Sequence, residues 1–199
     1  MNIVFDLGGV VFDWLPDRLA ARAFTDVDDQ QIAREEIIGH PDWLELDRGS
    51  ISQEQAIVNA VSRTGLPKSS IAGLFQLVGP LLTPIQPTID LVHELAQASQ
   101  HKLYVLSNMH QASIDYLEAN FDFWDLFEAK VISCRVGMVK PEPAIYNYLL
   151  RANDLAPGDT VFIDDMPPNI TAAQAAEMKA IQFEDTHRTR MELIRMGCL

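Results

Sequence analysis

Four short apolar segments, separated by long helical stretches, constrain the fold of this chain more than any other feature. Each is an uninterrupted apolar run: residues 3–5, 103–106, 131–132 and 161–163. Such runs are typical of strands buried on both faces, as in a parallel sheet covered by helices. Two of the intervening stretches place apolar residues at helical spacing: Ile89, Val92, Leu95 and Ala96, then Ile145, Tyr148, Leu149 and Ala152. This alternation predicts a doubly wound, Rossmann-like α/β sheet.

The last part of the chain predicts one more unit, with a helix near 169–178, a strand near 180–183 and a terminal helix. Residues 14–83 break the alternation, because they show helical spacing and turn signals but no strand pattern. A parallel crossover needs only about a dozen residues, so this long stretch is an insert. We therefore predict an α/β core formed by residues 1–13 and 84–199, with a small α-helical cap formed by residues 14–83.

Composition excludes several classes of partner. The chain has 199 residues and a formal net charge of −13, so it lacks the basic face that nucleic acid or an anionic membrane would require. No apolar stretch approaches the roughly 20 residues that span a bilayer, and Asp6 interrupts the first apolar run too early for a signal peptide. Cys134 and Cys198 lack metal-ligand spacing, which favours free thiols in a reducing compartment. We expect a cytoplasmic monomer or small homo-oligomer.

Asp6 follows the first apolar segment directly and leads into two glycines. Gly8 and Gly9 allow a tight turn in which backbone amide and carbonyl groups are accessible to a bound ion. An ionised carboxylate beside a buried strand has to be paired or has to coordinate a metal. For this segment alone, a structural aspartate that closes the turn is the alternative interpretation.

Polar side chains also follow the other three segments: Ser107-Asn108, Lys140 and Asp164-Asp165. Ligands of open α/β sheets collect at the carboxyl ends of the strands, so we expect these side chains to share one edge. Ser107-Asn108, at a predicted helix N-terminus, suits phosphate oxygens. Adjacent buried carboxylates are costly without a cation, and carboxylates with water and phosphate oxygen form a Mg²⁺ site. Taken singly, Ser107-Asn108 is also typical of a helix cap, and Lys140 of a surface lysine.

The order of these motifs resembles the haloacid dehalogenase-like hydrolase superfamily over essentially the whole chain. The matching motifs are Asp-x-Gly-Gly-Val at 6–10, Ser-Asn at 107–108, Lys-Pro-Glu-Pro at 140–143 and Asp-Asp at 164–165. The similarity is to the subgroup with a helical cap after the first motif. The string FDLGGVVFD, with Leu-Ser-Asn and the lysine segment, looks most like bacterial sugar-phosphate phosphatases such as the α-D-glucose-1-phosphate phosphatases.

The resemblance implies a Mg²⁺-dependent phosphomonoester hydrolase that acts on a small phosphorylated metabolite such as a sugar phosphate. Asp6 would be the nucleophile that forms an aspartyl-phosphate, and Lys140 would neutralise the charge shared by Asp6 and the phosphate. The resemblance also implies a metal site formed by Asp6, the Gly8 carbonyl and Asp165, with Asp164 acting through water or in support. It implies that phosphate is bound by Ser107, Asn108 and Lys140.

One departure from the family pattern concerns the proton for the leaving group. Most phosphatases of the family carry a second aspartate two residues after the nucleophile, where this chain has Gly8. Such a general acid/base contributes about 10²–10⁴-fold. The enzyme is therefore slow, or is helped by another residue or the substrate, or binds phosphate compounds without much turnover. Asp13 is the nearest remaining acid in sequence; the resemblance makes it a hinge residue at the cap, with a role as substitute base as the alternative. His110 either enters the site or lies on a helix surface.

Two residues of the insert are candidates for substrate contact. Arg48 precedes Gly49 in a segment, residues 47–52, that resembles the cap loop of such enzymes, where the arginine would meet the substrate or its phosphate. A solvated arginine is the alternative. Trp14, and with it Trp43, would offer an aromatic platform for a sugar, with core packing as the alternative.

Three other functions share parts of this pattern. The 2-haloacid dehalogenases form the same type of aspartate ester and also lack the second aspartate, but they need no metal, which leaves Asp164 and Asp165 without a role. A phosphomutase has to return the phosphoryl group by acid/base chemistry that Gly8 cannot perform. A metabolite- or protein-binding relative with weakened catalysis is the non-enzymatic alternative.

Overall fold

The computed structural model describes residues 1–98 and 100–199, and it confirms the predicted doubly wound parallel sheet. The strands are β1 Asn2–Phe5, β2 Lys102–Ser107, β3 Ala129–Ile132, β4 Thr160–Asp164 and β5 Lys179–Gln182. They lie in the order β3-β2-β1-β4-β5, and every neighbouring pair is parallel. The sequence order reverses around β1, so the switch point of the sheet lies between the carboxyl ends of β1 and its neighbours.

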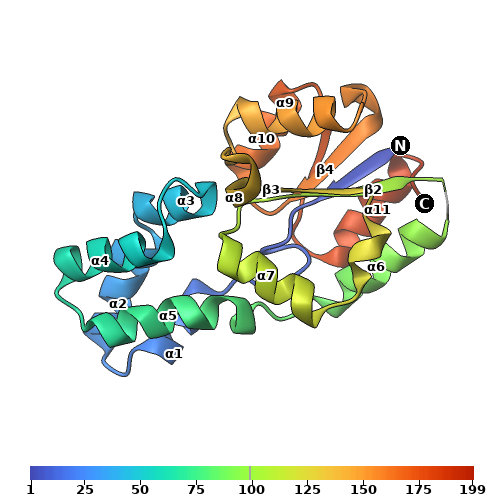
Figure 1. Ribbon diagram of the computed structural model, residues 1–199. Coiled ribbons are helices and arrows are strands. Elements are labelled where there is room, and N and C mark those ends of the chain that lie inside the picture. Colours follow the sequence, from blue (N-terminus) through green and yellow to red (C-terminus); the bar gives the residue numbers. More distant parts are fainter. Residues whose placement is uncertain (99) are drawn as a thin grey trace.

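Side chains of β1 alternate between two hydrophobic clusters, one on each face of the sheet. Ile3 and Phe5 belong to one cluster and Val4 to the other, and all three are fully buried. A strand covered on both faces therefore requires the uninterrupted apolar run seen in the sequence. Helices α6, α7 and α11 pack on the Ile3 face, and α9 and α10 on the Val4 face (Figure 1).

The core helices have the following bounds: α6 Gln86–Gln97, α7 Gln111–Asn120, α8 Ser133–Val136, α9 Pro143–Ala152, α10 Pro167–Ala175 and α11 Thr186–Arg195. Two short 3-10 turns, η2 Phe123–Leu126 and η3 Pro157–Asp159, precede β3 and β4. Pro143 occupies the first turn of α9, as expected, because a missing N–H costs little there.

Between β1 and α6 the chain forms a helical unit, which we define as α1 to α5. Its elements are α1 Pro16–Ala23, α2 Val27–Ala33, the π-helical η1 Arg34–Ile38, α3 Pro41–Arg48, α4 Gln53–Thr64 and α5 Lys68–Leu81. The unit has its own hydrophobic cluster, which includes Leu19, Ile71 and Leu74. Figure 1 shows it beyond the edge of the sheet at which β1 ends. A functional division at residues 14 and 83 stays a prediction.

The end of α3 contacts the core closely at a glycine. Gly49 caps α3 in the left-handed region, with φ of 80°, where a side chain would be strained. A Cβ added there would lie 2.8 Å from the carbonyl oxygen of Cys134 in α8. Both the turn and the close approach therefore require glycine, and α3 ends against the core.

One local expectation differs from the structure. Ser107 is the last residue of β2, but α7 begins only at Gln111, with His110 as its N-cap. Asn108 therefore lies in a loop and not at a helix N-terminus.

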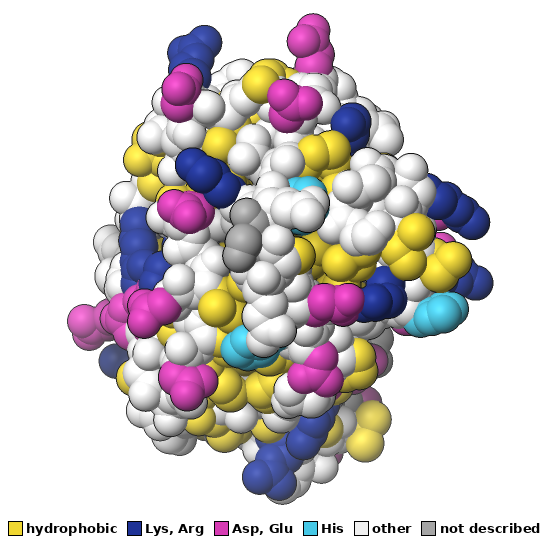
Figure 2. All heavy atoms as spheres, turned by 90° about the vertical axis from the view of Figure 1, so that its right-hand side faces the viewer, with side chains coloured by type: hydrophobic (Ala, Val, Ile, Leu, Met, Phe, Trp, Pro, Cys, Tyr) yellow, Lys and Arg dark blue, Asp and Glu magenta, His cyan; other side chains and the backbone are white. Residues whose placement is uncertain are grey.

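Among the described residues, no helix combines the length and apolar character needed to cross a membrane. Figure 2 shows acidic, basic and hydrophobic side chains interspersed on the side of the molecule that is at the right of Figure 1.

Candidate active site

Asp6 lies at the switch point of the sheet, one residue beyond β1. Its backbone N–H donates a hydrogen bond of 2.9 Å to the carbonyl oxygen of Ile163 on β4, so the residue is fixed by the sheet before the chain turns. Its carboxylate Oδ1 accepts a hydrogen bond of 2.7 Å from the N–H of Leu7. Asp6 is only 7% exposed, so its carboxyl group is held in place and largely removed from water.

The ammonium group of Lys140 bridges two carboxylates. Its Nζ lies 2.8 Å from Oδ1 of Asp6 and 2.6 Å from Oδ2 of Asp164. Asn108 fixes the lysine backbone twice: its side-chain NH₂ donates to the Lys140 carbonyl oxygen at 2.9 Å, and its side-chain oxygen accepts from the Lys140 N–H at 2.8 Å. The Asn108 side chain therefore positions Lys140, a contact that the sequence does not reveal.

Burial and charge together set the protonation of Asp6 and Lys140. Removal from water raises the pKa of Asp6 to about 7, although the charge of Lys140 acts to lower it. Burial alone would lower the pKa of Lys140, but the charges of Asp6 and Asp164 outweigh it and raise that pKa above its usual value. Lys140 is thus a fixed cation in an otherwise acidic site.

Asp164 and Asp165 have different surroundings at the end of β4. Asp164 is fully buried, and its carboxylate accepts hydrogen bonds of 2.9 and 3.0 Å from the Asn169 amide and of 2.8 Å from the Met166 N–H. Asp165 is half-buried, and burial followed by the charge of Asp164 raises its pKa. One oxygen from each of these two aspartates and one from Asp6 lie within 4.8 Å of one another. Three such carboxylates beside a single ammonium group fit a hard divalent cation such as Mg²⁺.

The hydroxyl group of Ser107 is available to a ligand. Ser107 is 1% exposed, and its Oγ makes no hydrogen bond of ordinary geometry among the described residues, although it lies close enough to Asp6 to lower the pKa of that carboxyl group. A buried hydroxyl without a partner is costly, and this one lies at the end of β2, the strand next to β1. A phosphate oxygen bound beside Asp6 would satisfy it.

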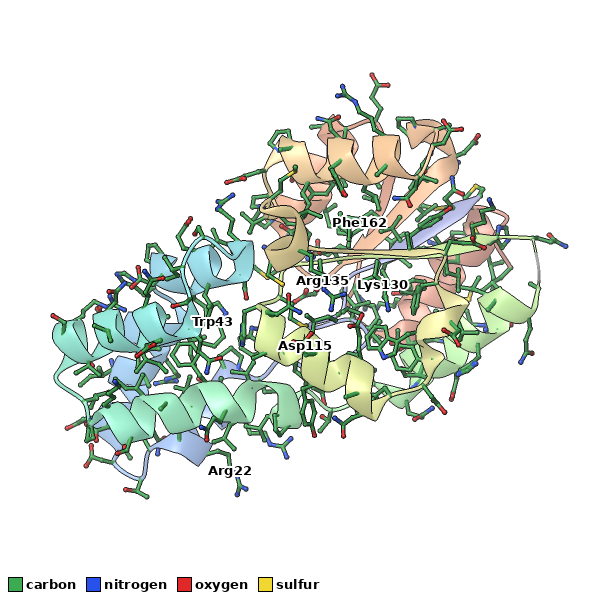
Figure 3. The ribbon with its side chains drawn as sticks, in the orientation of Figure 1. Arg22, Trp43, Asp115, Lys130, Arg135 and Phe162 are labelled. Carbon is green, nitrogen blue, oxygen red and sulfur yellow. The ribbon has the colours of Figure 1, made fainter. Side chains whose placement is uncertain are left out.

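A cleft of about 360 Å³ adjoins these groups. Asp6, Asn108, Lys140 and Asp165 line it, together with apolar side chains from the helical unit and the core that include Trp14, Ile38, Trp43, Leu44, Val78 and Met109. The rings of Trp14 and Trp43 lie 5.8 Å apart, and Figure 3 shows Trp43 in the helical unit, near the start of α7. Trp14 lines the cleft and also packs against the hydrophobic clusters of the core and of the helical unit.

Sequence reasoning missed a polar pair on the wall of this cleft. Oδ1 of Asp47, in α3, lies 3.2 Å from Nδ1 of His110, and both side chains are nearly buried. The other ring nitrogen of His110, Nε2, lies 2.8 Å from Oγ of Ser113. Burial raises the pKa of Asp47, although the hydrogen bond and charge of His110 lower it. His110 is thus no helix-surface histidine: all three residues line the cleft.

Arg48 does not lie where the resemblance implied. Its guanidinium group makes two hydrogen bonds to Glu142, of 2.8 and 2.7 Å, and a third to Glu45 at 3.3 Å. Arg48 is absent from the described residues that line the cleft, whereas its neighbour Asp47 is among them. Successive residues of a helix point to different sides, so the expected substrate contact is replaced by an ion pair between the helical unit and the core.

The two glycines after Asp6 differ in their freedom. Gly8 lines the cleft, and a Cβ there would meet Trp14 at an ordinary 3.7 Å. Gly9 has a φ of +81°, and a Cβ there would lie 2.6 Å from the Asp165 carboxyl group. Asp13, the nearest other acid in sequence, accepts a hydrogen bond of 3.0 Å from the Thr83 hydroxyl and does not line the cleft among the residues described.

Comparison with known proteins agrees with this geometry. A family model described as haloacid dehalogenase-like hydrolase matches residues 49–183. A sesquiterpene phosphatase of Aspergillus oryzae is 31% identical over 199 aligned positions, which cover 98% of this chain and 96% of that protein. The chain belongs to the haloacid dehalogenase-like hydrolase family.

Other similar proteins come from Bacteroides thetaiotaomicron. Its D-ribitol-5-phosphate phosphatase is 24% identical to this hydrolase over 208 aligned positions, covering 96% of each chain. A crystal structure of a haloacid dehalogenase family enzyme from the same organism, in complex with magnesium and inorganic phosphate, has a TM-score of 0.74 at 23% identity, covering 91% of this hydrolase and 92% of that chain. This structural likeness shows the fold that the two proteins share.

Proposed function

We propose that this hydrolase cleaves phosphate monoesters with Asp6 as its nucleophile. The observation that carries the proposal is the contact of Lys140 with both Asp6 and Asp164, beside the cleft-facing Asp165. A carboxylate oxygen of Asp6 attacks phosphorus, the bond to the leaving oxygen breaks, and an aspartyl-phosphate forms. Water then attacks phosphorus, which releases phosphate and returns the electron pair to Asp6. The charge of Lys140 offsets the negative charge that develops.

We further propose that the enzyme uses Mg²⁺. Asp6, Asp165 and the Gly8 carbonyl would hold the ion, with Asp164 in support, and the bound ion would supply positive charge to the phosphate oxygens. The Ser107 hydroxyl would donate a hydrogen bond to a phosphate oxygen. Asn108 keeps the lysine backbone in place through its paired hydrogen bonds.

The lining of the cleft favours a substrate with a hydrocarbon group. Trp14, Trp43 and Val78 offer apolar surface, whereas a sugar needs several polar partners for its hydroxyl groups. Asp47 and His110, on the same wall, already pair with each other. We therefore propose that the helical unit acts as a cap and binds an apolar organic group, with a sugar phosphate as the competing class. Named relatives represent both: a sesquiterpene phosphatase and a D-ribitol-5-phosphate phosphatase.

Hydrolysis of p-nitrophenyl phosphate tests the reaction. We expect Asp6→Asn to abolish turnover in a folded protein and EDTA to abolish it in the wild type, with recovery on addition of Mg²⁺. Asp13→Asn is the matched control, because that carboxylate lies outside the cleft lining, and it should stay active. Turnover by Asp6→Asn would reject the nucleophile, and turnover in EDTA would reject the metal. Release of chloride from 2-chloropropionate in EDTA would instead support a dehalogenase.

A series of n-alkyl phosphates tests the substrate class. Each buried methylene contributes about 0.8 kcal/mol, so kcat/KM should rise several-fold per methylene until the cleft is filled. D-ribitol 5-phosphate is the polar comparison. A flat alkyl series together with a better rate on ribitol phosphate would overturn the apolar class and leave the phosphatase reaction intact.

A further inference from the structure

Departure of an alkoxide from phosphorus requires a proton, and the cleft offers few sources of one. Its titratable lining residues, among those described, are Asp6, Asp47, His110, Lys140 and Asp165. The proposed reaction engages three of them, as nucleophile, fixed cation and metal ligand. Asp47 and His110 are the two that it leaves without a role.

Several neighbouring groups hold Asp47 and His110 in their contact with each other. The Asp47 carboxylate lies 3.2 Å from the imidazole of His110, with side-chain exposures of 10% and 3%. The Ser113 hydroxyl holds the far ring nitrogen at 2.8 Å, and the ring of Trp43 meets the imidazole edge-on at 5.7 Å. Burying polar groups is costly unless hydrogen bonds hold them. The orientation of both groups is therefore specified.

The backbone of Asp47 is anchored as firmly as its side chain. The Ser133 hydroxyl donates a hydrogen bond of 2.5 Å to the Asp47 carbonyl oxygen and accepts one of 2.8 Å from the N–H of Met109. A single serine of α8 thus joins the end of α3 to the loop after β2. That loop also carries Asn108, which positions Lys140.

The pair also shares its cleft with the reacting groups. It lines the same cleft as Asp6, and the charge of Lys140 acts on the Asp47 carboxyl group, lowering a pKa that burial raises. Lys140 in turn contacts Asp6 at 2.8 Å. Of the two partners, Asp47 has the more exposed side chain, at 10% against 3% for His110, which favours Asp47 as the one that contacts a substrate.

We propose that Asp47 is the general acid/base of this hydrolase and that His110 is its positioning residue. The inference rests on the proposed phosphatase reaction. A proton moves from the Asp47 carboxyl group to the leaving oxygen as the oxygen–phosphorus bond breaks, which leaves Asp47 as a carboxylate. In the second half-reaction the Asp47 carboxylate takes a proton from the attacking water and is again a carboxylic acid.

This assignment makes the proton donor depend on two parts of the chain. Asp47 belongs to the helical unit, and His110 belongs to the core. The pair exists only while the unit rests on the core, so the enzyme has its acid only when the cleft is closed around the organic group. Water is then excluded at the moment when the aspartyl-phosphate forms.

Leaving groups of different basicity test the proposal. Nitrophenolate leaves without a proton, whereas an alkoxide does not, and kcat/KM reports the half-reaction in which the leaving group departs. We expect Asp47→Asn to lower kcat/KM for hexyl phosphate by about 10²-fold or more, the range of general acid catalysis. For p-nitrophenyl phosphate it should fall by less than roughly tenfold. His110→Gln should also lower kcat/KM more for hexyl phosphate than for p-nitrophenyl phosphate, but by a smaller factor than Asp47→Asn.

The controls distinguish failure of this proposal from failure of the proposed phosphatase reaction. Asp13→Asn should change kcat/KM for the two esters by the same factor, because that acid lies outside the cleft lining. Equal losses on both esters in a folded Asp47→Asn protein would mean that the pair only anchors the helical unit, and this result would overturn the proposal. Full activity of Asp47→Asn on hexyl phosphate would do the same. If Asp6→Asn stays active, the phosphatase reaction itself fails, whatever Asp47 does.

Discussion

The guanidinium group of Arg48 makes two hydrogen bonds to the carboxylate of Glu142, of 2.8 and 2.7 Å. Arg48 ends α3 in the helical unit, and Glu142 is the N-cap residue of α9 in the core. Both side chains are partly exposed, so the pair contributes about 1 kcal/mol or less to folding. Its effect should therefore appear in how firmly the helical unit rests on the core.

We predict that Arg48→Ala raises KM several-fold for a long alkyl phosphate and less for methyl phosphate. Only the long substrate reaches the cleft walls that the helical unit supplies, so only its binding should suffer when the contact between unit and core is weakened. Steady-state kinetics on both esters gives the comparison. The melting temperature should change little.

Arg135 supplies the matched control. Its guanidinium group also makes two hydrogen bonds to one carboxylate, that of Glu118, at 3.0 and 2.7 Å. This pair joins α8 to α7 inside the core and does not involve the helical unit. A rise in KM for Arg135→Ala equal to that for Arg48→Ala would show that loss of any arginine pair has this effect.

Much of this site follows from the sequence, because it depends on local signals and one topological rule. Asp6, Lys140 and Asp164 each follow an apolar segment, and parallel strands bring their carboxyl ends to one edge. The pair of Asp47 and His110 depends instead on how the helical unit docks. A helix turns by about 100° per residue, so the sequence cannot say whether Asp47 or Arg48 faces the cleft. The docking of α3 on α8 decides it.

The two glycines near Asp6 should differ in how strongly the same substitution reduces activity. Gly9→Ala places a Cβ 2.6 Å from the Asp165 carboxyl group at a φ of +81°, so it should displace a proposed metal ligand and reduce Mg²⁺-dependent turnover strongly. Gly8→Ala meets Trp14 at 3.7 Å and keeps its backbone carbonyl, so its loss should be mild. Titration of activity with Mg²⁺ measures both. Equal effects would contradict this assignment.

The acidic cluster should make the metal-free protein less stable as the pH rises. Burial raises the pKa of Asp6 from its ordinary value of 3.8 to about 7, so the folded state holds a proton that the unfolded state releases between these two pH values. The stabilising contribution is therefore complete below about pH 4 and is lost as the pH rises through 7. Asp165, whose pKa is also raised, acts with the same sign.

Asp6→Asn isolates this effect. In EDTA, we expect the variant to gain free energy of unfolding relative to wild type as the pH rises from about 4 to about 7, because one pKa unit corresponds to about 1.4 kcal/mol. Urea unfolding at several pH values measures the difference. A gain that is constant across this range would mean that Asp6 is ionised throughout it. Asp13→Asn should show no such trend.

Gly8→Asp should restore a proton donor that is independent of the helical unit. The position lines the cleft, and a Cβ there makes only ordinary contact with Trp14, so the backbone accepts a side chain. The new carboxyl group would stand two residues after Asp6. In the Asp47→Asn background we expect it to raise kcat/KM for hexyl phosphate by at least about tenfold, because general acids contribute about 10²–10⁴-fold.

In the wild type the gain from Gly8→Asp should be smaller, since Asp47 already supplies the proton, and a double-mutant cycle measures this coupling. Gains of equal size in both backgrounds would show that the two carboxyl groups act independently.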